Sequence, residues 1–244
     1  VPAGVLLNIG VAGGNSTSVN DTLKNFQVTL ANGGEYVAIA NGVLTPASFA
    51  ANPDGASTAF TLFLQDQMRE SSTSADVDFR VVHGASDAPT VDVIARNVAT
   101  LVNDASYSNI TPYITVPAAS YTLDVTPAAG SPIVATFTAD LSTLGGGSAV
   151  VFASGFLTPS ANQNGAAFGL FAALANGTVV AFPAASVARL QVIHNAADPA
   201  AASVDVYVNG ALLLDNFAFR TATPFINVPA GVLLNIGVAG GNST

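Results

Sequence analysis

The chain has 244 residues, of which half are apolar and only 9% are charged. Acidic residues outnumber basic ones by 15 to 6, which gives a formal net charge of −9, so nucleic-acid binding through phosphate neutralisation is not expected. The absence of cysteine excludes disulfides, thiolate metal sites and cysteine nucleophiles. Because so few charges keep neighbouring molecules apart in water, the composition favours self-association.

The first part of the chain reads as short strands. Its apolar positions recur in twos or in short runs, and no helical spacing persists over three turns. Strands are predicted at residues 5–11, 22–30, 36–40 and 59–64, and turn sequences such as Asn52-Pro53-Asp54-Gly55 separate them. The charged, serine-rich run at residues 65–78 then predicts a linker between two domains.

The remainder of the chain continues the same pattern. Asn176-Gly177 and Asn209-Gly210 each lie between strand-like runs and predict type I′ hairpin turns. Residues 141–188 carry no charge, but Gly, Pro and Asn interrupt them too often for a membrane span. Strands of this length with a turn about every ten residues predict an antiparallel β-sandwich, with a barrel of similar size as the alternative.

The two ends of the chain have one sequence. Residues 228–244 repeat residues 1–17 without a difference, at an offset of 227 (228 − 1). The chain is therefore interpreted either as a window cut from a tandem array of that period or as a subunit whose tail reproduces its own head. Because it begins without an initiator Met or a signal segment, we interpret it as mature or internal sequence.

A second, weaker repeat relates the two halves of each period. His83 and His194 lie 111 residues apart (194 − 83) within a shared pattern. Further matching pairs of segments are residues 111–118 with 223–230, 42–46 with 155–159, and 59–63 with 167–171. The sequence therefore predicts two immunoglobulin-like or transthyretin-like β-sandwich domains per period. One is whole (77–186), and the other is split into a first half (187–244) and a second half (1–76). The short, proline-bearing boundary at 182–186 predicts a semi-rigid joint.

The histidine-containing segments also carry a family resemblance. Residues 81–93 read V-V-H-G-A-S-D-A-P-T-V-D-V, a related run occupies 192–206, and I-T-V-P-A-A-S-Y-T-L-D-V follows at 114–125. This pattern resembles a bacterial family of extracytoplasmic repeat domains of unknown function, whose hallmark is V-V-H-A-S-P-D-A-P-x-V-D-V followed by V-P-A-G. The resemblance implies a compact β-sandwich, often in tandem on secreted or surface-anchored proteins, and it carries over no catalytic residue. The departures are Gly84, where the family prefers Ala, and a three-residue insertion at 200–202.

Two groups of side chains could act as a general base or bind a metal. They are His83, Asp87 and Asp92 in the first copy of the pattern, and His194, Asp198 and Asp205 in the second. Neither group has a third ligand at a suitable spacing or an identifiable Ser nucleophile. A loop that determines the fold must recur in both domains whereas an active site need not, so we predict structural roles for these residues, no enzyme activity and no cofactor or metal.

Other kinds of site have less support. Calcium could use Asp21, Asp54, Asp66 and Asp104, but no dense run offers ligands at alternate positions. Lys24 is the only lysine, so an intramolecular Lys–Asn isopeptide bond could form in one domain at most. N-x-S/T sequons that could carry glycans begin at residues that include Asn15, Asn20, Asn109 and Asn176. Finally, Tyr107, Tyr113, Tyr121 and Tyr207 could form a sugar-stacking face but are expected to pack within the strands.

These observations predict a structural repeat of an extracellular filament or giant surface fibre, located outside the cell or on its surface, whose partner is a further copy of itself. Successive units would join head-to-tail or by strand complementation. The expected joint consists of Val1, Pro2, Gly4, Val228, Pro229 and Gly231. The alternative is an adhesin stalk or binding module that displays loops to glycan or protein partners, and an enzyme comes third.

Overall fold

A computed structural model describes residues 1–128, 130, 133–208, 210–230 and 234–243. The described chain is built from β-strands and a few single-turn 3₁₀ helices, which confirms the all-β prediction. Three parts are distinguished below: the N-terminal segment (1–76), the central domain (77–186) and the C-terminal segment (187–244).

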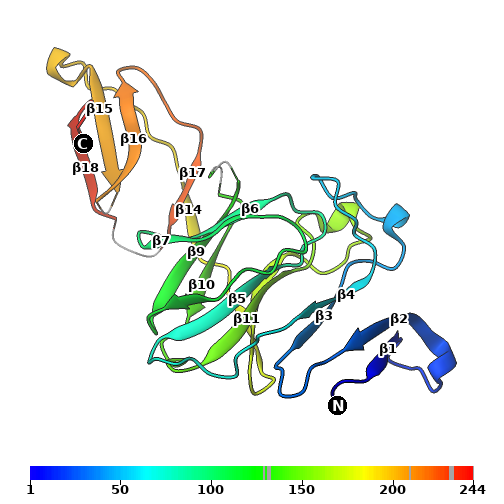
Figure 1. Ribbon diagram of the computed structural model, residues 1–244. Helices are drawn as coiled ribbons and strands as arrows, with labels where there is room; N and C mark the ends of the chain where they lie inside the picture. Colours follow the sequence, from blue (N-terminus) through cyan, green and yellow to red (C-terminus); the bar gives the residue numbers. More distant parts are fainter. Residues whose placement is uncertain (129, 131–132, 209, 231–233, 244) are drawn as a thin grey trace.

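The central domain is a sandwich of two sheets (Figure 1). One sheet has the strand order β10-β9-β6-β7 and the other β13-β12-β11-β5-β8. The strands are β5 (Val77–His83), β6 (Val91–Ala95), β7 (Ala99–Ala105), β8 (Ile114–Val116), β9 (Ser120–Pro127), β10 (Ala135–Asp140), β11 (Ser148–Ser154), β12 (Gly169–Leu174) and β13 (Val179–Phe182), and the 3₁₀ helix η3 (Pro159–Ala161) precedes β12. The pairing is antiparallel except between β5 and β11, which run parallel because the chain crosses to the other sheet and back between them.

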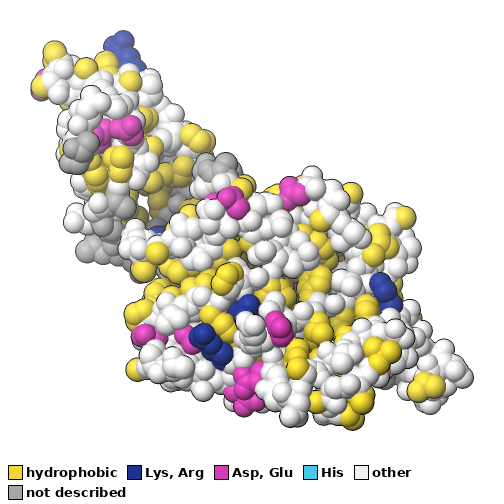
Figure 2. Space-filling model, viewed as in Figure 1, with side chains coloured by type: hydrophobic (Ala, Val, Ile, Leu, Met, Phe, Trp, Pro, Cys, Tyr) yellow, Lys and Arg dark blue, Asp and Glu magenta, His cyan; other side chains and the backbone are white. Residues whose placement is uncertain are grey.

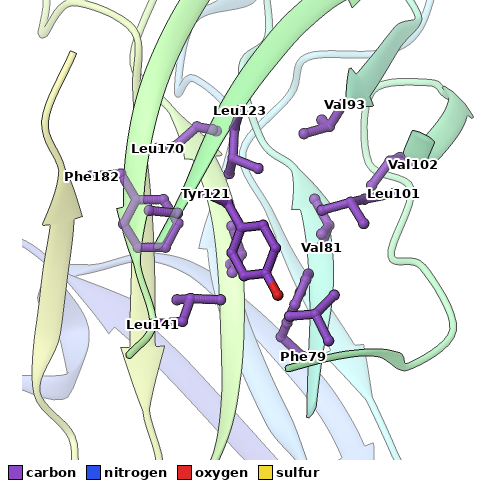
Figure 3. Close-up of a pocket in the computed structure, with 13 residues that line it drawn as sticks. Phe79, Val81, Val93, Leu101, Val102, Tyr121, Leu123, Leu141, Leu170 and Phe182 are labelled. Carbon is purple, nitrogen blue, oxygen red and sulfur yellow. The ribbon is translucent and has the colours of Figure 1, made fainter. Parts of the chain in front are cut away.

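The core of the molecule lies between these two sheets. Apolar side chains alternate along the strands, so that one set points inward from each sheet, as Figure 3 shows for Phe79, Leu123 and Phe182. An enclosed cavity of about 30 Å³ remains among them, lined by apolar side chains and by the ring of Tyr121. Because its volume is that of about one water molecule and no polar atom lines it, this space is a packing void in the core.

The N-terminal segment forms two separate hairpins. Its strands are β1 (Leu6–Ala12), β2 (Thr22–Thr29), β3 (Val37–Asn41) and β4 (Thr61–Gln65), with the 3₁₀ helices η1 (Val19–Asp21) and η2 (Pro46–Ser48). β1 pairs with β2 and β3 pairs with β4, both antiparallel. Neither hairpin has a second sheet of its own to pack against. Val43, at 8% exposed, is the one buried apolar residue of this segment, all of which the structure describes.

The C-terminal segment forms a two-stranded sheet, β14-β17, and a three-stranded sheet, β16-β15-β18. The strands are β14 (Val187–Leu190), β15 (Ser203–Val208), β16 (Ala211–Ala218), β17 (Ile226–Pro229) and β18 (Ile236–Gly240), and η4 (Pro199–Ala201) precedes β15. No strand of this segment pairs with a strand of the N-terminal segment in the part of the chain that the structure describes. The two segments lie at opposite ends of the molecule (Figure 1).

The β3–β4 hairpin lies against the outer face of the five-stranded sheet. Val82 and Val150 alternate with core residues of β5 and β11 and therefore point out of the sandwich, yet both are buried. Val37 lines a cleft together with Val150 at this contact, and the Asn41 side-chain amide donates to the Tyr107 hydroxyl at 3.0 Å. The hairpin thus packs one face on the central domain and leaves its other face uncovered.

One of the two predicted type I′ turns differs in the structure, and the other lies partly outside the described residues. At Asn176-Gly177 only Gly177 has a positive φ, +84°, and its N–H donates to the Leu174 carbonyl at 2.9 Å, so type I′ is wrong here. The loop from β12 to β13 is longer than the two residues that a type I′ hairpin requires. At the second predicted turn Gly210 has φ +83°, and Asn209 lies outside the described residues.

The surface carries few charges. In Figure 2 apolar side chains are scattered over the face in view, and basic and acidic side chains occupy only small areas. In the described residues, no helix combines the length and the apolar character that crossing a membrane demands.

Candidate functional site

The two histidines hold equivalent loops. His83 Nε2 donates to the Pro89 carbonyl at 3.0 Å, and His194 Nε2 donates to the Ala201 carbonyl at 2.8 Å. Both imidazoles are buried. Burial lowers the pKa of His83 below its ordinary value, although the hydrogen bond to Pro89 acts in the opposite direction. Each ring therefore fixes the crossing from one sheet to the other, and its donor nitrogen faces backbone rather than an open cleft.

Asp92 and Asp205 hold equivalent β-bulges. Asp92 Oδ1 accepts from the Asp104 backbone N–H at 2.7 Å, and Asp205 Oδ1 accepts from the Asn216 N–H at 2.7 Å. Asp104 and Asn216 both have positive φ, where the paired strand makes its irregularity. Hydrogen bonds from the Asn216 N–H and from Ser243 hold the pKa of Asp205 below its ordinary value.

Asp87 and Asp198 differ in their partners. The Asp87 carboxylate accepts from the N–H groups of Leu157 and Thr158, both at 2.9 Å, and from the Asn162 side-chain amide at 2.9 Å. It thereby ties the loop between the sheets to the loop between β11 and β12. Asp198 is exposed and accepts from the Ala200 N–H at 2.9 Å as the N-cap of η4. The spacing from Asp198 to Asp205 is two residues longer than that from Asp87 to Asp92 (7 against 5), so the predicted three-residue insertion is wrong by one residue, and η4 lies in this longer loop.

Strand registers define which residues are equivalent in the central domain and the C-terminal segment. The equivalent bulges at Asp92 and Asp205 show that β6 corresponds to β15. Val93 of β6 pairs with Val125 of β9, and Val206 of β15 pairs with Val238 of β18, so Val125 and Val238 are equivalent. Val125 is 3% exposed and Val238 is 67% exposed. One strand position therefore belongs to the core of the central domain and faces solvent in the C-terminal segment.

The same comparison holds for the N-terminal segment. In the β9–β10 pair Leu123 lies opposite Phe137, and in the β1–β2 pair Ile9 lies opposite Phe26. Phe137 contacts the ring of Phe168 with centroids 5.8 Å apart, and Phe26 contacts the ring of Phe60 at 6.1 Å. β1 and β2 therefore correspond to β9 and β10.

The β3–β4 hairpin corresponds to β11–β12. Val43 forms a parallel bridge with Ala59 just as Phe156 does with Ala167, and the preceding Gly42 and Gly155 have φ +88° and +83°. An added Cβ at Gly155 would lie 2.3 Å from the Ala167 carbonyl oxygen, so the close approach of the two loop strands requires glycine there. In this correspondence the uncovered face of β3–β4 is the face that β11 and β12 turn toward the core.

The duplicated sequence makes a different strand pair in each of its two positions. Residues 6–12 pair with β2, and residues 236–239, which are the copies of residues 9–12, lie in β18 and pair with β15. β9 of the central domain makes both pairs at once, with β10 on one side and β6 on the other. Each copy of the duplicated segment therefore shows one half of the pairing that a complete domain requires.

The residues predicted for the inter-unit joint lie in unlike surroundings. Val1 is 99% exposed, whereas Val228, its copy, is 6% exposed and pairs with Ala188. Pro2 is exposed, and Gly4 has φ +71° and donates its N–H to the Leu30 carbonyl at 2.8 Å. The Pro229 backbone pairs with Val187. Gly231 lies outside the described residues.

Hydrogen bonds fasten the N-terminal segment to the central domain. Arg69 forms an ion pair with Asp78 at 2.7 Å, and its backbone N–H donates to the Tyr113 hydroxyl at 2.7 Å. Burial by itself would raise the pKa of Asp78, but hydrogen bonds from Thr115, Arg69 and Ser72 outweigh it and lower that pKa. The predicted linker is therefore held along its length.

A second contact between these two parts had no signal in the sequence. The Asn52 amide donates to the carbonyls of Ser86 and Ala88, both at 3.0 Å, and Asp54 accepts from the N–H and hydroxyl of Thr90. These residues read as turn formers in the sequence, and only the packing of the two loops gives them partners in another domain.

Hydrogen bonds also hold the connection between the central domain and the C-terminal segment. The Thr138 N–H donates to the Pro183 carbonyl and the Ala185 N–H donates to the Thr136 carbonyl, both at 2.9 Å. Residues 183–185 thus run along the edge strand β10 before the chain enters β14.

The four tyrosines considered for sugar binding are buried or make contacts within the protein. Tyr107 and Tyr121 are buried, Tyr113 lies between the guanidinium groups of Arg69 and Arg80, and the Tyr207 hydroxyl contacts Ser243. Among the residues that the structure describes, no three His, Cys, Asp or Glu side chains lie close enough together to hold a metal ion.

Comparison with known proteins identifies the class of the central domain. Residues 77–162 match a family described as a domain of unknown function (DUF4397). This match covers β5 to β11 and ends just after η3. Neither the search of curated proteins nor that of solved structures gives a significant match. The central domain is therefore a β-sandwich that matches a family whose function is unknown.

Proposed function

We propose that the chain is one unit of an extracellular filament or giant surface fibre, in which each unit completes the split domain of its neighbour. The observation that carries this proposal is that β1 and β18 both come from the duplicated segment and make the two complementary halves of the β9 pairing. In the joined domain a single strand would pair with β15 of one unit and with β2 of the next.

The exposed apolar side chains support this proposal. Large exposed apolar residues are concentrated in the two end segments, at Val1, Val5, Leu6, Val19, Leu23, Leu44 and Leu64 and at Val187, Ile193, Leu212, Phe225, Ile236 and Val238. Several of them occupy strand positions whose equivalents lie in the core of the central domain. Burying such surface is the main source of stability for a β-sandwich, so each incomplete half gains most from the other half.

The geometry of a single unit also suits a linear assembly. The two half-domains lie at opposite ends of the molecule, so a unit cannot satisfy its own halves and must offer one to each neighbour (Figure 1). An interface that uses two different surfaces generates an open chain of units unless the rotation closes a ring. The same joint serves successive repeats of one long chain, where residues 228–244 of one repeat are residues 1–17 of the next.

Electron microscopy of the purified chain without any ligand tests this function. We expect ordered polymers with an axial repeat of two domains, and dynamic light scattering should show growth with protein concentration. A chain that remains monomeric at high concentration contradicts the proposal. The alternative, an adhesin stalk or binding module, predicts monomers that retain a defined partner on a glycan or protein array.

A further inference from the structure

The exposed carboxylate of Asp198 matches a pair of free backbone N–H donors in the N-terminal segment. In the central domain, Asp87 holds the backbone N–H groups of Leu157 and Thr158. Asp198 follows His194 at the same four-residue spacing at which Asp87 follows His83. If the split domain closes as the central domain does, Asp198 requires two N–H donors from a loop like that between β11 and β12.

Residues 42–46 provide such a loop. They read G-V-L-T-P where residues 155–159 read G-F-L-T-P. Thr45 has φ −126° and ψ 78°, and Thr158 has φ −123° and ψ 79°, so this threonine has the same backbone conformation in both loops. Within the described part of the chain, the N–H groups of Leu44 and Thr45 have no hydrogen-bond acceptor.

The donors and the acceptor must belong to different units. Leu44 lies in the N-terminal segment, which packs on one side of the central domain, and Asp198 lies in the C-terminal segment at the other end of the molecule (Figure 1). The Asp198 carboxylate has one donor, the Ala200 N–H of its own loop, and lacks the two inter-loop donors that its equivalent Asp87 has. The free N–H groups of Leu44 and Thr45 match those two donors, which specifies the occupant of this surface as a second copy of the chain.

The parallel pair of β5 and β11 supplies the register of the contact. Phe152 lies opposite Val82 in that pair, and the Gly84 N–H donates to the Ala153 carbonyl at 3.1 Å. The equivalent residues in the split domain are Ile39 for Phe152 and Ile193 for Val82. Val82 is buried and Ile193 is exposed, as expected for a strand that awaits its neighbour.

We propose that Asp198 of one unit accepts hydrogen bonds from the N–H groups of Leu44 and Thr45 of the next, and that β3 lies parallel to residues 191–194 with Ile39 opposite Ile193. This inference rests on the proposed function and specifies its joint. The carboxylate fixes the order of the units, because only the C-terminal segment carries it and only the N-terminal segment carries the free donors.

Disulfide trapping between two full-length variants tests the register. The chain has no cysteine of its own, so Ile39→Cys and Ile193→Cys introduce single thiols, one in each chain. After mixing with oxidised glutathione, we expect an interchain disulfide between these positions, identified by mass spectrometry of the linked peptides. The matched control pairs Ile39→Cys with Leu212→Cys, an exposed position of β16 that the proposed joint places away from β3.

Charge removal tests the role of Asp198. Asp198→Asn retains a side chain that caps η4 but removes the charge and one acceptor oxygen, so association between units should weaken by about 10- to 100-fold in sedimentation equilibrium. Asp215→Asn, which changes an exposed carboxylate of β16, should leave association unchanged.

The outcomes separate the joint from the filament. A trapped disulfide in a closed dimer supports the joint and contradicts the filament. Filaments without the Ile39–Ile193 disulfide, or with equal assembly of the Asp198→Asn and Asp215→Asn variants, overturn the joint and leave the filament standing. Trapping at the level of the Leu212 control likewise overturns the proposed register.

Discussion

The central domain and the two end segments have related sequences and unlike interiors. β9 lies between two neighbours with its apolar side chains enclosed, and Leu123 is 6% exposed. The equivalent Ile236 of β18, which has one neighbour and faces no complete second sheet, is 54% exposed. Local sequence thus suffices to form the hairpins, whereas burial requires the opposite sheet of the sandwich.

The comparison also separates contacts that are local from those that complete a domain. Bulges, the glycine at the start of each inter-strand loop and the histidine-to-carbonyl bonds are present in both the central domain and the end segments. The contacts that differ join strands far apart in the sequence, such as β5 with β11. The end segments therefore have the local structure of a sandwich and lack its long-range pairing.

The largest expected effect comes from the paired phenylalanines. Phe137→Ala should destabilise the central domain by about 3–5 kcal/mol, because the ring is buried against the core. Phe26→Ala, at the equivalent position of β2, should cost about 1 kcal/mol in the unassembled unit. Urea denaturation followed by tyrosine fluorescence measures the first, since the chain has no tryptophan and Tyr121 lies in the core.

Assembly should reduce this difference. If the split domain is completed by a neighbour, the cost of Phe26→Ala measured on assembled protein should approach that of Phe137→Ala. Equal costs in the unassembled unit would mean that the end segments already have a closed interior, and the contrast between the regions would be lost.

A smaller effect is expected from the bulge carboxylates. Asp92→Ala leaves the Asp104 N–H without its acceptor and should destabilise the central domain by about 1–3 kcal/mol. Asp205→Ala should instead raise hydrogen-exchange rates in β16 and β18 and leave the central domain unchanged, because Asp205 holds Asn216 and Ser243. Asp92→Asn, which keeps one acceptor oxygen, is the control. Loss of central-domain stability in Asp205→Ala would show that the regions are coupled.

The smallest effect concerns pH. Since the pKa of His83 is lowered by burial, the unfolded chain binds a proton at a higher pH than the folded chain does. The stability that neutral His83 contributes is complete above the ordinary histidine pKa of about 6.5 and is lost as the pH falls toward the pKa of the folded state. Over this range the free energy of unfolding should change by less than about 1.4 kcal/mol per pH unit. Chemical denaturation between pH 7 and pH 5 should show this slope, and His83→Gln should remove it. An unchanged slope in His83→Gln contradicts the assignment, and His194→Gln in the other segment is the control.

Much of the architecture followed from the sequence because it depends on local patterns. The strands predicted at residues 5–11, 22–30, 36–40 and 59–64 lie within two residues of β1 to β4. The division of the chain into one whole and one split domain stays a prediction. The parallel pairing of β5 with β11 was not predicted, because strand direction within a sheet depends on the path of the chain between the sheets. The prediction of a type I′ turn at Asn176 was wrong because the Asn-Gly dipeptide does not determine the length of the loop.

For the candidate site, the sequence alone established the 17-residue duplication of the two chain ends, the pairing of the two histidine patterns and the low charge, since these depend only on which residues stand where. The tertiary structure alone decided that Asp87 has two backbone donors and Asp198 does not, and that the uncovered face of β3–β4 is the one equivalent to a core face. These contacts could not be predicted from the sequence, because residues far apart along the chain meet only when two sheets or two loops pack together. Burial and hydrogen bonding depend on what lies across that interface rather than on neighbours along the chain.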